Sequence, residues 1–178
     1  MRKKITFFLA LIFLISGSQS VSAMGSGDKY IDFQTGVTFQ VLKPTNTLNL
    51  PKLNFEIRPC RLYPNKEEYL LAGFGSADRG IALVETAAAF NCTGKDSPTF
   101  LKNIVINGIK AKVGIYCLAN CITKSFQEYG GEITFTVPKS DSLAATYIRV
   151  GTQGGFTLKQ LRTFALGLKP AMSNRQKY

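Results

Sequence analysis

Apolar and polar residues alternate along much of the chain. The segment 53–58 is a clear case, because Leu53, Phe55 and Ile57 alternate with polar residues. A period of two places successive side chains on opposite faces of a strand. Together with turn residues at the ends of the segments, this pattern predicts strands with one buried face. The predicted strands are 37–42, 53–58, 67–75, 80–85, 132–137 and 146–150.

The dipeptide Asn107-Gly108 separates two further apolar runs and is a strong local signal for a hairpin. Both residues tolerate the positive φ angles that a two-residue hairpin turn requires. In the second arm, apolar residues from Ile109 to Ile115 alternate with Lys110 and Lys112, and Cys117 continues the apolar face. The hairpin is therefore predicted to be covered on one side only.

Near the C-terminus the apolar period changes from two to that of a helix. Thr157 and Gln160 have capping-box spacing, which predicts a helix start, and Pro170 is expected to close the segment. The apolar residues at helical spacing are Leu158, Leu161, Phe164, Ala165 and Leu168. The pattern predicts an α+β fold, an antiparallel β-sheet with a C-terminal amphipathic helix packed on one face.

The first 23 residues have the pattern of a secretory signal peptide. Three basic residues precede an apolar run, and the small residues "VSA" end at Ala23. A membrane anchor is the alternative, but it needs about 20 apolar residues and this run is shorter. We therefore expect export to the periplasm or the outside of the cell, and no transmembrane segment in the mature chain. The expected organisation is a signal peptide (1–23), a flexible leader (24–36), one domain (37–170) and a basic tail (171–178).

The composition argues against several kinds of chemistry. The chain contains no His, which removes the usual general base and the commonest catalytic metal ligand. The adjacent Glu67 and Glu68 would point to opposite faces of a strand, so they do not form a carboxylate pair. We expect a protein without enzymatic activity, without a cofactor and without a metal site. No recognisable motif suggests nucleic-acid binding.

The formal net charge of +11 is unevenly distributed, because no acidic residue follows Asp141. Such a basic segment could contact an envelope protein or an anionic envelope polymer. The candidate contacts are Arg149, Lys159, Arg162 and Lys169. A basic surface that only keeps the protein soluble explains the same pattern.

Four cysteines remain to be explained, and structural disulfides are the preferred explanation. A zinc site usually needs two close cysteine pairs, and only Cys117 and Cys121 are close. A thioredoxin-like motif would need a spacing one residue shorter. Export to an oxidising compartment favours disulfides. If the strand continues through Cys121, Cys117 and Cys121 each pair with Cys60 or Cys92. If the chain turns after Cys117, the pairs are Cys117–Cys121 and Cys60–Cys92. Asn120 is a good turn former, so the second pairing is preferred.

The order of these motifs resembles a family of uncharacterised bacterial extracytoplasmic domains. Members occur at the C-terminus of anti-sigma-factor-like regulators and as exported proteins. The resemblance covers about Val37–Pro170 and is carried by the Pro-containing N-terminal strand, the "NG" hairpin and the closing amphipathic helix. The four cysteines are not part of that pattern. The resemblance implies a sensing or binding module outside the membrane, with no catalytic residues to carry over.

Two functions are therefore expected from the sequence. The first is an exported, disulfide-stabilised, non-enzymatic binding or sensing module of the bacterial cell envelope. The alternative is an inhibitor or immunity-type protein that blocks a secreted hydrolase, for which a small rigid protein loses little entropy on binding.

Overall fold

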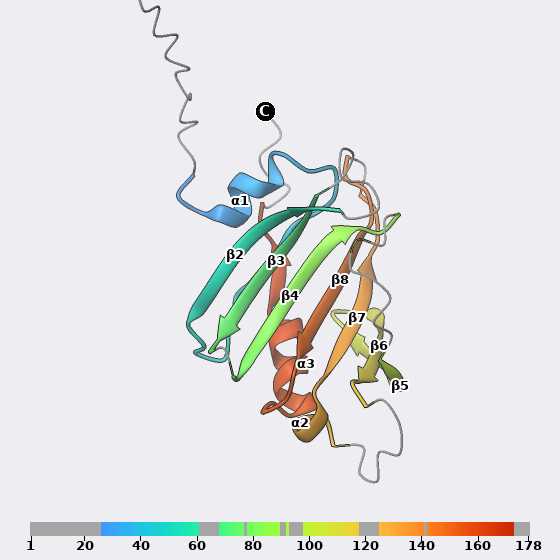
Figure 1. The fold of residues 1–178 in the computed structure, drawn as a ribbon. Coiled ribbons are helices and arrows are strands. Elements are labelled where there is room, and N and C mark those ends of the chain that lie inside the picture. The colour runs from blue at the N-terminus through green and yellow to red at the C-terminus, as the bar shows by residue number, and fades with distance from the viewer. Residues whose placement is uncertain are drawn as a thin grey trace, which may run out of the picture.

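The computed structural model describes residues 26–172 except 61–67, 77, 90, 91, 93–97, 118–124 and 141. The expected signal peptide (1–23) and most of the expected basic tail (171–178) lie outside the described residues. Figure 1 shows a twisted antiparallel sheet with a helix against one face. The elements are α1 (Lys29–Gln34), β1 (Leu42–Pro44), β2 (Lys52–Pro59), β3 (Glu68–Gly75), β4 (Gly80–Ala87), β5 (Thr99–Ile106), β6 (Ile109–Ile115), α2 (Phe126–Tyr129), β7 (Gly131–Val137), β8 (Thr146–Thr152), α3 (Leu158–Leu166) and β9 (Leu168–Pro170).

The main sheet contains seven strands in the order β2-β3-β4-β8-β7-β6-β5. All of its neighbouring strands are antiparallel, and β8 joins the N-terminal meander to the C-terminal one by pairing with both β4 and β7. The broad prediction of an α+β fold built on an antiparallel sheet is confirmed.

The hairpin predicted at Asn107-Gly108 is present between β5 and β6. Both residues have positive φ, 48° and 82°, and Ile106 pairs with Ile109 across the turn. Ala111 and Val113 are buried while Lys110 and Lys112 are exposed, so one face of this hairpin is covered, as the alternation predicts.

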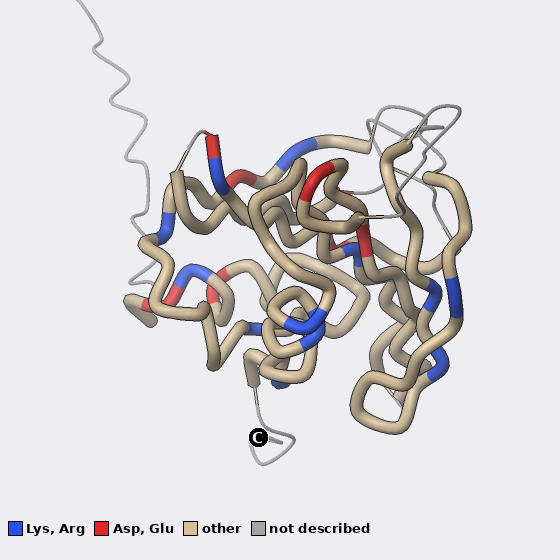
Figure 2. Tube along the Cα trace, turned by 90° about the horizontal axis from the view of Figure 1, so that it is seen from below, with Lys and Arg blue, Asp and Glu red and all other residues tan. Residues whose placement is uncertain are grey.

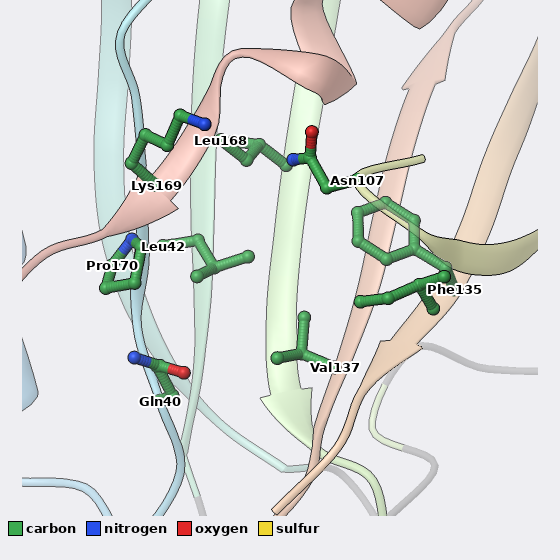
Figure 3. Close-up of a pocket in the computed structure, with 9 residues that line it drawn as sticks. Gln40, Leu42, Asn107, Phe135, Val137, Leu168, Lys169 and Pro170 are labelled. Atoms are coloured by element: carbon green, nitrogen blue, oxygen red, sulfur yellow. The ribbon is translucent and has the colours of Figure 1, made fainter. Parts of the chain in front are cut away.

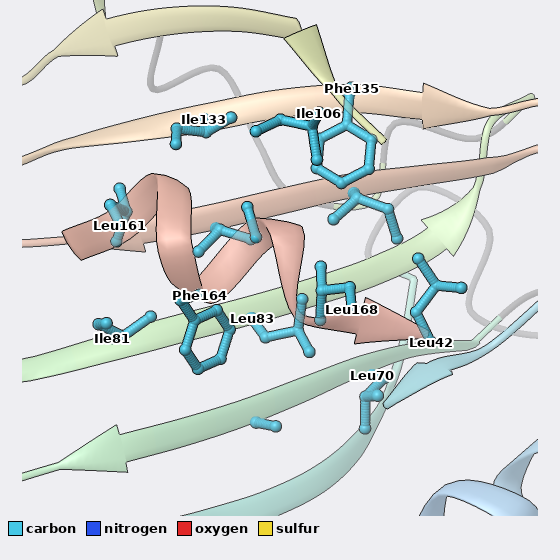
Figure 4. Packing of buried hydrophobic residues seen from close by; sticks show 14 of the residues in the cluster. Leu42, Leu70, Ile81, Leu83, Ile106, Ile133, Phe135, Leu161, Phe164 and Leu168 are labelled. Carbon is cyan, nitrogen blue, oxygen red and sulfur yellow. The ribbon is translucent and has the colours of Figure 1, made fainter. Parts of the chain in front are cut away.

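Helix α3 packs on the sheet and supplies the centre of the core. Thr157 and Gln160 form the predicted capping box. Figure 4 shows Leu161 and Phe164 directed toward the strands, and both are fully buried. Phe164 also contacts Phe74 of β3 edge to face, with 5.2 Å between the ring centroids. The helix is therefore held to the sheet by its apolar side, as its spacing predicts.

A second, two-stranded sheet pairs β1 with β9 and was not predicted. The helix ends at Leu166, so Leu168 belongs to β9 and not to the helix. The expected strand at 37–42 is also wrong in its bounds, because Phe39 forms only an isolated bridge and the strand begins at Leu42. Leu42 pairs with Pro170 and Pro44 with Leu168, a long-range pairing that local patterns do not reveal.

The burial predicted for 53–58 is wrong, although the strand itself is present as β2. Leu53 and Ile57 are 52% and 47% exposed. β2 lies at an edge of the main sheet, and only Phe55 in its middle packs against the core. At an edge, the alternating pattern gives the strand but does not guarantee that another layer covers its apolar side.

The flexible leader assigned to 24–36 is wrong for Lys29–Gln34, which form α1. Asp28 caps this helix, since its side chain accepts a hydrogen bond from the Tyr30 backbone N–H at 3.0 Å. Tyr30 and Phe33, three residues apart on one side of the helix, are buried in the core. The segment is therefore ordered by packing against the rest of the domain.

Candidate anion-binding cleft

A cleft lies where α1, β1 and β2 meet. Its volume is about 540 Å³. Apolar residues on its wall include Pro44, Leu50 and Phe74. Its charged residues are Asp28, Lys29, Lys43 and Lys52, which come from the start of α1, from β1 and from the start of β2.

Among the described residues that line this cleft, Asp28 is the only carboxylate, and it has two structural roles. It caps α1, and it forms an ion pair with Lys43. The hydrogen bond from Lys43 lowers the pKa of Asp28, opposed by partial burial and assisted by the bond from the Tyr30 backbone. Asp28 is therefore ionised at neutral pH and neutralises one of the three lysines.

Lys52 lies over two aromatic rings. Its Nζ is 4.6 Å from the ring centroid of Phe55 and 5.1 Å from that of Tyr30. The two rings pack edge to face with 4.9 Å between their centroids. Desolvation lowers the pKa of Lys52 first, and repulsion from Lys29 and Lys43 lowers it further, although Asp28 opposes this. The ring faces attract the ammonium group and fix its place in the cleft.

The charges of the cleft do not balance. Three ammonium groups, from Lys29, Lys43 and Lys52, face the single carboxylate of Asp28. The repulsion felt by Lys52 shows that the positive charges interact with one another. A bound anion would relieve that repulsion, so the arrangement favours a phosphate or carboxylate ligand.

The structure separates Arg149 from the other predicted anion contacts. Arg149 lies on β8 between Ile148 and Val150, whose side chains are buried in the core, so it points to the opposite face of the sheet from α3. There its Nε is 3.7 Å from Glu132 Oε2, which also accepts a 2.7 Å hydrogen bond from the Tyr116 hydroxyl. Arg149 is thus part of a local ion pair.

Lys159, Arg162 and Lys169 are exposed. Lys159 and Arg162 are one turn apart on α3, whereas Lys169 lies on β9 directly opposite Lys43 of β1. Figure 2 shows the basic residues spread over several parts of the trace and not gathered on one face. The sequence therefore predicted some of the basic surface residues, but not that they lie in separate parts of the molecule.

Sequence reasoning missed Lys29, Lys43 and Lys52 as a group. Lys29 fell in the expected leader, and the other two flank the Pro-containing segment between β1 and β2. Their meeting depends on the pairing of β1 with β9 and on the docking of α1 beside β2. The one local signal was Asp28, an N-cap residue two positions before Tyr30, which forms an i, i+3 aromatic pair with Phe33.

The predicted disulfide Cys60–Cys92 is present, with 4.7 Å between the two Cα atoms. It joins the end of β2 to the segment after β4, and both cysteines are buried. Cys117 is disulfide-bonded as well, and therefore to neither of these two. Cys121, its expected partner, lies outside the described residues.

No protein-family model, no curated protein and no solved structure matches the chain. Among the helices of the described residues, none is long and apolar enough to cross a membrane. The described part of the chain also holds no group of three or more His, Cys, Asp or Glu side chains that could bind a metal ion.

Proposed function

We propose that the protein is an exported, disulfide-stabilised, non-enzymatic binding or sensing module of the bacterial cell envelope that captures an anionic envelope polymer in the cleft between α1, β1 and β2. The convergence of Lys29, Lys43 and Lys52 around one aspartate carries this proposal. The sensing role comes from the resemblance to extracytoplasmic domains of regulators.

The number of lysines at the cleft favours it over α3 as the binding site. Lys159 and Arg162 project from an exposed helix, where each ion pair with a ligand is worth only about 0.2–1 kcal/mol. The cleft instead offers three cations to one ligand, with apolar walls from Leu50 and Phe74. Several cations around one site act together on one ligand.

Binding of polyphosphate, used as the probe, tests the proposal by titration calorimetry at several salt concentrations. The double variant Lys29→Gln/Lys52→Gln should weaken binding roughly 2- to 30-fold, since each exposed pair is worth about 0.2–1 kcal/mol. Binding should also weaken as salt rises, because the Debye length falls from about 30 Å at 0.01 M to about 8 Å at 0.15 M.

The matched control is Lys159→Gln/Arg162→Gln, which removes the same charge from α3. If this variant loses binding and the cleft variant does not, the helix surface is the anion site and the cleft is not. A partner that binds at 1:1 stoichiometry with no dependence on salt would instead support the inhibitor alternative.

A further inference from the structure

A second cavity lies between the ribbon formed by β1 and β9 and strand β7. Figure 3 shows its two walls: Leu42, Leu168 and Pro170 on one side, and Phe135 and Val137 of β7 on the other. The cavity has a volume of about 270 Å³, and Ile109 of the β5–β6 hairpin also lines it. We call this cavity the β7–β9 groove.

Among the described residues that line the β7–β9 groove, the polar ones lie at its two ends. Lys169 and Asn107 lie at one end and Gln40 at the other (Figure 3). Part of the hydrogen-bonding capacity of the Asn107 side chain is already taken, because its Nδ2 donates a 3.3 Å hydrogen bond to the Leu166 carbonyl. Lys169 is exposed, so a single cation stands at the mouth of an apolar channel.

We propose that the β7–β9 groove binds a medium-chain fatty acid, with the acyl chain between β9 and β7 and the carboxylate at Lys169. This site is separate from the lysine cleft and does not rest on the function proposed for it. Apolar walls with one charged group at the rim are typical of sites for small amphiphiles. The positive charge of Lys169 selects an anionic head group.

The size of the groove sets the length of the chain. A volume of 270 Å³ is that of roughly nine water molecules in the liquid, and a methylene group is similar in size to a water molecule. One unbranched chain of about that length fits, whereas the paired chains of a phospholipid do not. Each methylene buried is worth about 0.8 kcal/mol, so affinity should rise about fourfold per added methylene until the groove is full.

Titration calorimetry with decanoate and hexanoate, both below the concentrations at which they form micelles, tests this inference. Decanoate should bind at 1:1 stoichiometry and more tightly than hexanoate. Decyltrimethylammonium has the same chain with a cationic head and should bind more weakly than decanoate. Lys169→Gln should weaken decanoate about two- to fivefold and leave the ammonium amphiphile unaffected or bound more tightly.

Two Val→Asp variants distinguish the loss of the groove from a general effect of an added carboxylate. Val137→Asp places a carboxylate in the apolar wall and should weaken decanoate at least about tenfold. Val105→Asp is the matched control, because Val105 is 51% exposed on β5 and does not line the groove. Circular dichroism of both variants checks that they are folded, and Lys169→Gln, at an exposed position, tests the site independently of folding.

Equal affinities for decanoate and hexanoate, or equal losses in the two Val→Asp variants, would overturn the inference. So would gel filtration showing a dimer without ligand that Val137→Asp converts to a monomer, since a second copy would then fill the groove. Lys29→Gln/Lys52→Gln should weaken decanoate binding much less than polyphosphate binding, and Val137→Asp should do the reverse, so either proposal can fail alone.

Discussion

Replacing Glu85 by Gln should make the protein more stable at neutral pH. Glu85 lies in β4, and its side chain is completely buried. Its Oε2 accepts a 2.8 Å hydrogen bond from the Leu42 backbone N–H, but among the described residues Oε1 has no hydrogen-bond partner. The Tyr30 hydroxyl, whose pKa is raised by burial and by Glu85, is also buried without a partner in that part of the chain. The site therefore holds a neutral carboxyl group much better than a charged one.

The sign and size of the pH dependence follow from this environment. Burial raises the pKa of Glu85 well above its ordinary value, and the bond from Leu42 only partly opposes this. The folded state therefore keeps a proton that the unfolded state loses above its pKa of about 4.3. The contribution of protonated Glu85 to the free energy of unfolding is complete below that pH. Above it, this contribution falls by about 1.4 kcal/mol per pH unit, until the pKa of folded Glu85 is reached.

Glutamine keeps an oxygen for the Leu42 N–H and cannot ionise. Urea unfolding of the wild type and Glu85→Gln, with disulfides intact, should therefore give a difference that is constant below about pH 4. The difference should then grow in favour of Gln by up to about 1.4 kcal/mol per pH unit, until the pKa of folded Glu85 is reached. Glu68→Gln, at an exposed position in β3, is the matched control for the loss of one carboxyl group. A pH-independent difference for Glu85→Gln would refute the assignment of a buried neutral carboxyl.

Three further predictions concern the fold and are checked by the same denaturation experiments. Ile148→Ala, at a fully buried position in β8, should lower the free energy of unfolding by about 2–5 kcal/mol. Ile57→Ala, on the exposed side of β2, should lower it by less than about 1 kcal/mol. Similar losses in the two variants would mean that β2 is covered. Replacing Cys60 and Cys92 by Ala should cost about 2–5 kcal/mol, because their bond closes a loop with a sequence separation of 32; unchanged stability would contradict a structural role. Thr157→Ala should lower the free energy of unfolding by about 1 kcal/mol. Thr157→Ser should lower it much less, since Ser retains the capping oxygen.

Local signals in the sequence were sufficient for most elements of the fold. The Asn107-Gly108 turn and the Thr157 capping box involve residues within a few positions of one another, so their chemistry is visible in the sequence. The Cys60–Cys92 bond was preferred because a turn after Cys117 would leave those two cysteines for each other. In each case a short-range constraint left few alternatives.

The candidate sites could not be predicted because they depend on contacts between distant segments. Lys43 and Lys169 stand opposite each other across a pairing of residues 126 positions apart, and Lys52 reaches the cleft only because α1 packs beside β2. The same limit explains Leu53, whose alternating pattern shows a strand but not whether a layer covers it. Glu85 gave no signal either, since a Glu that ends an apolar run is usually at the surface.

The β1–β9 ribbon links the two proposed sites electrostatically. Lys43 lines the cleft and Lys169 lines the β7–β9 groove, yet the two are register partners on one face of the ribbon. Cross-strand partners have their Cβ atoms about 4.5–5.5 Å apart, which is well within the Debye length of about 8 Å at physiological salt. A carboxylate bound at Lys169 lowers the positive potential that attracts an anion to Lys43. The two sites should therefore oppose each other weakly, by an amount that grows as salt is removed, and by linkage each ligand must weaken the other by the same factor.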